Sequence, residues 1–141
     1  MNRVKWISAL VLLSIPLMAA AQMQPDTRVV THVPFKFMVG NVTLPAGEYS
    51  VQAAENSQGM LVVRSLDTQA STLTLASADE TSKSAPTSAL VFHKSGGNYF
   101  LAGVRVQDSS TIYEFSAGKL EKELLSKNAP ATEELLIAGT K

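Results

Sequence analysis

Residues 90–104 read LVFHKSGGNYFLAGV, two apolar runs joined by Gly96-Gly97. This pattern predicts a β-hairpin with a two-residue turn, because glycine adopts the positive φ angles that such turns require. With the turn centred on the glycines, His93 lies opposite Phe100, whereas a three-residue loop would pair His93 with Leu101. Both faces of the hairpin are then apolar, which predicts a central position in a sheet. One face is predicted to carry Leu90, Phe92, Tyr99 and Leu101, and the other Val91, His93, Phe100, Ala102 and Val104.

The same two-residue period runs through the chain before this hairpin. Phe35 and Phe37 alternate with polar or flexible residues, so they share one face of a predicted strand. Residues 44–49, LPAGEY, predict a second hairpin. Pro45 fixes φ at the first corner of a turn, and Gly47 can close a three-residue loop with a bulge.

The middle of the chain continues as short strands separated by turns. Residues 60–64 are apolar on both faces, which predicts a central strand. Residues 70–77 alternate, with Leu73 and Leu75 on one face. Residues 79–87 are rich in Ser and Thr and contain a proline, so we expect a polar, mobile loop there.

The period changes only near the carboxyl end. Residues 117–127 predict a helix, with Leu120 and Leu124 one turn apart. Residues 133–138 predict a closing strand, with a helix as the alternative. Together these patterns predict an all-β, single-domain β-sandwich or small β-barrel of about 7–9 short strands with one C-terminal helix.

The first 21 residues have the pattern of a secretory signal peptide. Arg3 and Lys5 precede an uncharged apolar run over residues 7–20, and Ala19-Ala20-Ala21 supplies an A-x-A cleavage site. The run is shorter than the roughly 20 residues that a comfortable membrane span needs. We therefore expect cleavage near Ala21, no membrane span in the mature chain, and a periplasmic or secreted location.

Three segments follow from this interpretation. Residues 1–21 are the signal peptide, residues 22–31 a loose leader, and residues 32–141 a single β-rich domain. The chain has no cysteine. It therefore lacks a lipobox thiol for a lipid anchor, and the domain must be held together by its core without disulfides.

Charge excludes one class of partner. The chain has 12 basic and 12 acidic residues, and loss of Arg3 and Lys5 with the signal peptide leaves it slightly acidic. No basic stripe is present to contact phosphates, so we expect no nucleic acid partner.

Catalytic motifs are not evident. There is no G-x-S-x-G elbow, no glycine-rich phosphate loop before a helix, and no metal-ligand spacing around His32 and His93. Asp79-Glu80 is an adjacent pair in the predicted loop rather than a glycosidase dyad. We expect no catalytic residue, metal or cofactor, and hence no enzymatic activity; the remote alternative is a hydrolase that uses His93.

The aromatic residues have two interpretations. They are expected to fill the core, because aromatic side chains carry the largest burial per residue. The alternative is a small β-barrel that binds an apolar small molecule in its interior. The weak candidates for ligand binding are Phe35, Phe37, Tyr49, Phe92, His93 and Tyr99. The main expectation is a binding or structural role in the envelope or outside the cell, with another envelope protein or a small apolar ligand as the candidate partner.

Three motifs carry a family resemblance: VPFKFMVGNVTLPAGEYSV, LVFHKSGGNYFLAGV and GKLEKELL. Over residues 33–125 the chain resembles a family of small exported bacterial β-rich proteins that show VPF-x-F-x-V-G, LPAG-x-Y and LVFH-x-x-G-x-x-YFL. The family has no established activity, substrate or cofactor, so the resemblance implies an exported β-rich domain and assigns no site residues. Residues 103–116 depart from the family pattern, which has an aromatic and a proline-containing stretch before the helix.

Overall fold

A computed structural model describes residues 28–55, 57, 59–127 and 133–140. In these residues ten strands and a single short helix confirm the all-β class. The elements are β1 Val29–Val33, β2 Phe37–Val39, β3 Val42–Leu44, β4 Gly47–Ala53, β5 Met60–Ser65, β6 Ser71–Glu80, β7 Ala89–Ser95, β8 Asn98–Arg105, β9 Thr111–Phe115, α1 Lys119–Ser126 and β10 Glu133–Ala138. No helix in the described part of the chain is long and apolar enough to cross a membrane.

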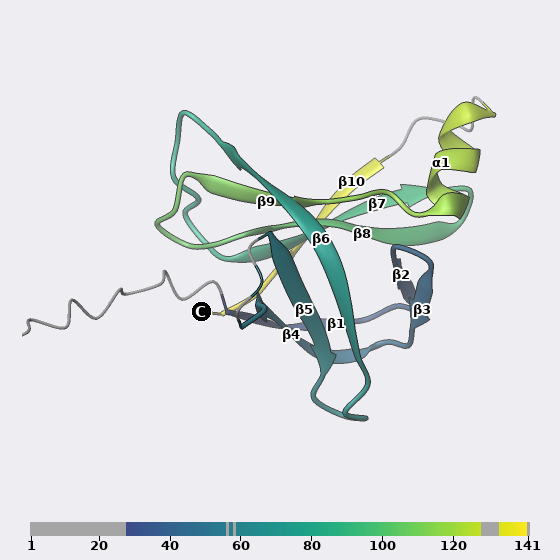
Figure 1. The fold of residues 1–141 in the computed structure, drawn as a ribbon, viewed down its shortest axis with the longest axis horizontal. Coiled ribbons are helices and arrows are strands. Elements are labelled where there is room, and N and C mark those ends of the chain that lie inside the picture. Colours follow the sequence, from purple (N-terminus) through teal and green to yellow (C-terminus); the bar gives the residue numbers. More distant parts are fainter. Residues whose placement is uncertain (1–27, 56, 58, 128–132, 141) are drawn as a thin grey trace, which may run out of the picture.

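The strands form two layers that share the long strand β6. Layer A holds β1, β4, β5 and the first half of β6, which pairs with β5. Layer B holds the second half of β6, then β9, β8, β7 and β10. β2 pairs with β8, and β3 pairs with β2. The sheet is not closed into a barrel. In Figure 1, β6 runs steeply across the view while β7, β8 and β9 run nearly horizontally.

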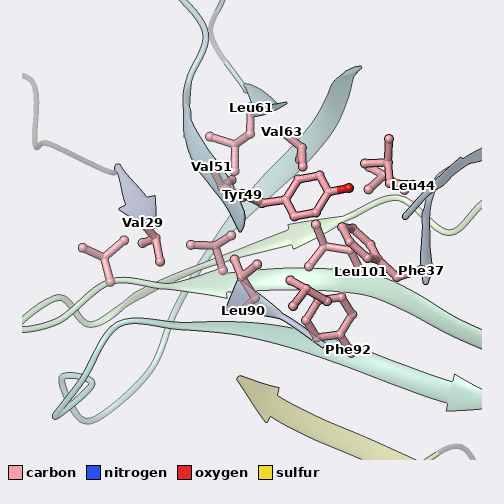
Figure 2. Close-up of a cluster of buried hydrophobic side chains, with 14 residues drawn as sticks. Val29, Phe37, Leu44, Tyr49, Val51, Leu61, Val63, Leu90, Phe92 and Leu101 are labelled. Carbon is pink, nitrogen blue, oxygen red and sulfur yellow. The ribbon is translucent and has the colours of Figure 1, made fainter. Parts of the chain in front are cut away.

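The core lies between the two layers. Tyr49 and Val51 of β4 face Phe37, Leu90 and Phe92 from layer B, and all five are buried. Figure 2 shows these side chains converging from both sides. Burial of this apolar surface is the main stabilising term in a chain without disulfides. The full cluster is Val29, Val33, Phe37, Val39, Leu44, Tyr49, Val51, Leu61, Val63, Leu90, Phe92, Leu101, Val104 and Val106.

The predicted hairpin at residues 90–104 is confirmed as β7–β8. Its turn is Gly96-Gly97, with φ angles of 58° and 77°, and His93 pairs with Phe100. The hairpin is central, because β7 also pairs with β10 and β8 with β9 and β2. One face assignment was wrong. A register shift between Val91 and Phe92 places Val104 opposite Leu90 in the core rather than on the face of His93.

Residues 44–47 do not form the predicted second hairpin. β3 pairs with β2, whereas β4 pairs with β1 and β5, so the turn carries the chain from layer B to layer A. Gly47 has a φ of 156°, and the carboxylate of Asp67 lies against it while accepting the Glu48 N–H at 2.9 Å. A side chain at residue 47 would meet that carboxylate. The glycine therefore serves the crossover between layers.

Several segments begin or end at other residues than the sequence predicted. β1 begins at Val29, which is completely buried, so the sheet starts inside the predicted leader 22–31. Asp79 and Glu80 end β6 instead of opening a loop, because they pair with β9. The helix occupies Lys119–Ser126, and residues 133–138 form a strand. The predicted signal peptide lies outside the described residues.

Helix α1 is fixed to layer B at several points. The Asn41 side-chain oxygen accepts the Lys119 N–H at 2.8 Å, and Gly118 packs against the backbone of Gly40. At the other end of the helix, the Leu124 side chain lies over Gly96 of the hairpin turn. These contacts place α1 over the outer face of the β7–β8 hairpin, at the right-hand end of layer B in Figure 1.

Candidate functional site

The predicted aromatic candidates come together, but they pack on one another. Phe37 lies edge-on to Tyr49 and to Phe92, at ring-centroid distances of 4.9 and 5.3 Å. Phe35 lies edge-on to Phe92 at 5.2 Å and stacks on Tyr99 at 3.8 Å. Edge-to-face contacts of this kind are favourable packing arrangements. These rings therefore fill the interior, and the open sheet does not supply the closed barrel that the interior-ligand alternative needs.

Tyr49 is held as a neutral structural residue. Its side chain is completely buried, and its hydroxyl donates a hydrogen bond to the Pro45 carbonyl at 2.5 Å. Burial raises the pKa of Tyr49 above its ordinary value of 10.0, and the negative charge of Asp67 raises this pKa further, while a hydrogen bond with Ser65 acts in the opposite direction. The phenol is thus a hydrogen-bond donor at neutral pH.

The aromatic cluster reaches the surface at Tyr99. Tyr99 and Phe35 are half-buried, and the Lys94 ammonium lies 5.6 Å from the Tyr99 ring centroid. An exposed cation–π contact of this type contributes about 0.5–1 kcal/mol. Lys94 and Phe35 thus both contact the Tyr99 ring.

His93 has a carboxylate partner that the sequence analysis missed. Its Nδ1 lies 3.2 Å from Oε1 of Glu121 on α1, and the two side chains are 36% and 10% exposed. A signal was present, because Glu121 lies three residues before Leu124 and therefore on the same side of the helix. The sequence analysis singled out only Leu120 and Leu124 on this helix, so the carboxylate of Glu121 on its buried side was overlooked.

No nucleophile accompanies the His93–Glu121 pair among the described residues. Ser95 follows His93 by two residues and so shares its strand face, but its hydroxyl is buried and has no hydrogen-bond partner among the described residues. No hydrogen bond from a serine or threonine to His93 is present in the described part of the chain. A hydrolytic triad needs the nucleophile within hydrogen-bond reach of the histidine. The pair instead joins α1 to β7.

Four aliphatic side chains form an exposed surface on the outer face of layer A. Met60 pairs with Leu75 and Val62 pairs with Leu73, so all four lie side by side on one face. Leu73 is 58% exposed and Leu75 61% exposed, while Met60 and Val62 are half-buried. We call these four residues the β5–β6 patch. The sequence predicted that Leu73 and Leu75 share a face but did not predict that this face is uncovered.

A groove lies at the other end of layer B from α1. The connection between β6 and β7 forms one wall, and the outer face of β7 to β10 forms the floor. The cavity volume is about 420 Å³. Lys83 and Arg105 bring positive charge to this groove, and Ile112 and Leu136 bring apolar surface. None of the six predicted ligand-binding residues lines it.

The two histidines lie on different strands. His32 is exposed on β1, opposite Glu48, and His93 is on β7. In residues 28–55, 57, 59–127 and 133–140, no three His, Cys, Asp or Glu side chains gather in a way that could hold a metal ion.

Comparisons with known proteins assign no role to these residues. No protein-family profile, no curated protein and no solved structure matches the chain. The family resemblance of residues 33–125 therefore stays a prediction from sequence, and function is inferred from the surfaces described above.

Proposed function

We propose that this protein is an exported, non-enzymatic binding domain that holds another envelope protein through the β5–β6 patch. The observation that carries this proposal is the exposure of Leu73 and Leu75, each more than half uncovered, beside Met60 and Val62. Contiguous apolar surface on a folded protein marks an interaction site.

The shape of the patch favours a protein over a small molecule. The four side chains lie on the flat face of paired strands, whereas small-molecule sites are concave. Polar side chains border the patch, with Arg64 opposite Ser71 on one side and Gln52 opposite Val62 on β4. An apolar centre with a polar rim is the usual anatomy of a protein–protein interface. A standard interface has roughly 20–30 residues on each side, so the patch would be its centre.

The small net charge of this chain favours a partner that is not strongly charged either. Without Arg3 and Lys5 the 12 basic residues become 10 against 12 acidic ones, so the mature chain is close to neutral. Arg64 is the charged residue that adjoins the patch on β5. Electrostatic steering is weak for such a surface. Recognition would depend on apolar contact and shape.

Export is part of the proposal and rests on residues 1–21. The proposed route is cleavage near Ala21 followed by release into the periplasm or the medium. Mass spectrometry of the protein recovered from cell fractions tests this, and the same spectrum detects any small molecule that co-purifies. We expect a mature chain that begins close to Gln22 in the periplasmic or extracellular fraction. A chain that retains Met1 and stays in the cytoplasm would contradict export.

In-cell photocrosslinking tests the binding role. A benzophenone amino acid is placed at Leu73, and at Leu125 of α1 as a matched control, since Leu125 is a leucine of similar exposure at 52%. We expect an ultraviolet-dependent adduct between position 73 and one envelope protein. The adduct should disappear when Leu75→Lys is added to the same chain, and position 125 should give none.

Three results would refute the proposed role. They are an absence of adducts at position 73, equal adducts at positions 73 and 125, and an adduct that contains only a second copy of this chain. The hydrolase alternative has its own test, because His93→Ala would abolish any hydrolytic activity. Activity that persists in His93→Ala would exclude His93 as its catalytic residue.

A further inference from the structure

We infer that the groove between the β6–β7 connection and layer B binds an aliphatic monocarboxylate. This site is separate from the β5–β6 patch, which lies on layer A. The volume of about 420 Å³ falls within the roughly 300–1,000 Å³ range of small-molecule sites. Figure 1 shows the β6–β7 connection and α1 at opposite ends of layer B, so the helix does not cover the groove.

The charges at the groove select an anion. Lys83 and Arg105 line it, and no acidic residue is among the described residues of the lining. Arg105 Nη2 lies 3.3 Å from Oε1 of Glu134, which partly offsets the guanidinium charge. Two cations and one adjacent carboxylate leave about one net positive charge, which matches a monoanion better than a dianion.

Arg105 retains donors for a ligand. A guanidinium has five N–H donors, and the described residues provide the Arg105 side chain with one ion-pair contact, that with Glu134. The Arg105 Nε–H is buried and has no hydrogen-bond partner among the described residues. Planar guanidinium donors suit the two oxygens of a carboxylate. Lys83 is exposed and forms no ion pair with the described residues, so its charge is available as well.

The rest of the lining selects an aliphatic group. Ile112 and Leu136 line the groove together with Pro86 and Ala89, and Leu136 is 47% exposed. These side chains lie beside the two cations, so one molecule with a charged head and a short hydrocarbon tail would contact both. Burial of such a tail contributes about 0.8 kcal/mol for each methylene.

Backbone hydrogen bonds hold the wall of the groove in place. The Thr81 N–H donates to the Ser110 carbonyl at 2.8 Å, and the Ala85 N–H donates to the Ser109 carbonyl at 3.0 Å. The Asp108 N–H in turn donates to the Ala85 carbonyl at 3.0 Å. The connection is therefore tied to the β8–β9 loop at two places. A site formed in advance loses less conformational entropy when a ligand binds.

Calorimetric titration of the purified mature protein with octanoate tests this site. Octanol has the same chain without the charge, octylamine has the opposite charge, and acetate has the charge without the chain. We expect saturable one-to-one binding of octanoate, at least tenfold weaker binding of octanol and acetate, and no binding of octylamine. Affinity should also fall as ionic strength rises.

Variants locate the site. We expect Arg105→Gln to weaken octanoate binding at least tenfold, and Lys83→Gln, at an exposed position that leaves the fold intact, to weaken it about threefold. Lys94→Gln removes one positive charge elsewhere and should leave the affinity unchanged. Leu75→Lys should also leave it unchanged, which separates this site from the partner-binding patch.

Several results would overturn the inference. Equal affinity for octanoate and octanol would indicate apolar partition alone, and equal affinity for octanoate and acetate would indicate an anion site without an aliphatic pocket. An unchanged affinity in Lys83→Gln and in folded Arg105→Gln would place any binding elsewhere. Absence of octanoate binding at millimolar concentration would also refute it.

Discussion

The outer faces of the two layers differ in what covers them. On layer B, Phe100 shares the outer face with His93 and is only 1% exposed. On this face Glu121 of α1 contacts His93, the cross-strand partner of Phe100. On layer A, Leu73 and Leu75 occupy the equivalent outward side of β6 and are 58% and 61% exposed. Both faces are apolar in sequence. The difference shows that an alternating pattern decides which residues share a face, whereas covering that face depends on another element.

Specific contacts hold α1 on the outer face of layer B, whereas no element covers the β5–β6 patch among the described residues. Asn41, Gly118 and Glu121 each fix α1 to its neighbours, so the apolar surface beneath the helix contributes to stability. The β5–β6 patch has no such cover among the described residues. Its leucines therefore contribute little to folding, and the proposed binding role would account for their exposure.

The largest expected effect comes from removing the side chain under α1. Phe100→Ala should lower the free energy of unfolding by about 3–5 kcal/mol, because it deletes a fully buried ring and leaves a cavity. Leu75→Ala, on the bare face, should change it by no more than about 0.5 kcal/mol. Guanidinium unfolding of both variants measures the contrast. Similar losses in the two variants would show that the patch is also covered.

A smaller effect is expected where the helix meets the β2–β3 turn. Gly118 has an ordinary φ of −74°, but a Cβ at this position would collide with the Gly40 carbonyl. Gly118→Ala should therefore cost about 1–3 kcal/mol through overpacking rather than backbone strain. Ser116→Ala, at an exposed position before the helix, is the control. Unfolding curves check both, and a neutral Gly118→Ala would mean that α1 is not held closely at this end.

The interior of layer A provides a third contrast with its bare exterior. Tyr49→Phe should cost about 1 kcal/mol at neutral pH, since it removes the hydrogen bond to Pro45. Because burial raises the pKa of folded Tyr49 above 10.0, the unfolded chain loses its proton first as the solution becomes alkaline. Wild-type stability should therefore fall as pH rises from about 10 toward the raised pKa.

The Tyr49→Phe variant has no phenol to ionise at position 49, so its stability should fall less than that of the wild type as pH rises above about 10. Unfolding free energies measured at pH 8, 10 and 11 for both proteins test the sign. An equal loss in both proteins would show that the phenol is not responsible.

The smallest effect is expected on the patch itself. Leu73→Thr with Leu75→Thr introduces β-branched side chains, which are compatible with a strand, and removes exposed apolar surface. Stability should change by about 0.5 kcal/mol or less at each position, while fluorescence of a hydrophobic dye bound to the native protein should fall. Unchanged dye fluorescence would indicate that other residues form the exposed apolar surface.

Local patterns were sufficient to predict the hairpin and the helix. The Gly96-Gly97 turn fixed the pairing of His93 with Phe100, because a two-residue turn leaves little freedom of register. The alternation also placed Leu73 and Leu75 on one face.

Features that depend on distant contacts could not be predicted. The chemistry of Pro45 and Gly47 is that of a hairpin turn, and only the pairing partners of β3 and β4 reveal a crossover. The bulge that places Val104 in the core cannot be recognised in the alternation of apolar and polar residues. Glu121 could have been singled out from its spacing to Leu124, but its partner His93 lies 28 residues earlier in the chain.

The groove also escaped prediction for a physical reason. Lys83 and Arg105 lie on different elements, and each resembles an ordinary surface charge in sequence. The hydrogen bonds between the β6–β7 connection and the β8–β9 loop place them at one site. Residues 79–87 were expected to be a mobile loop, and the observed bonds instead make residues 81 and 85 part of a defined wall.

Cysteine protection tests the central claim most directly, because the chain has no cysteine and a single introduced thiol reports one position. Leu73→Cys and the control Leu125→Cys are labelled with a maleimide, first in the purified protein and then in intact cell envelopes. The proposal predicts fast labelling of both thiols in the purified protein and strong protection of position 73 alone in the envelope. Equal labelling of the two positions in the envelope would contradict it.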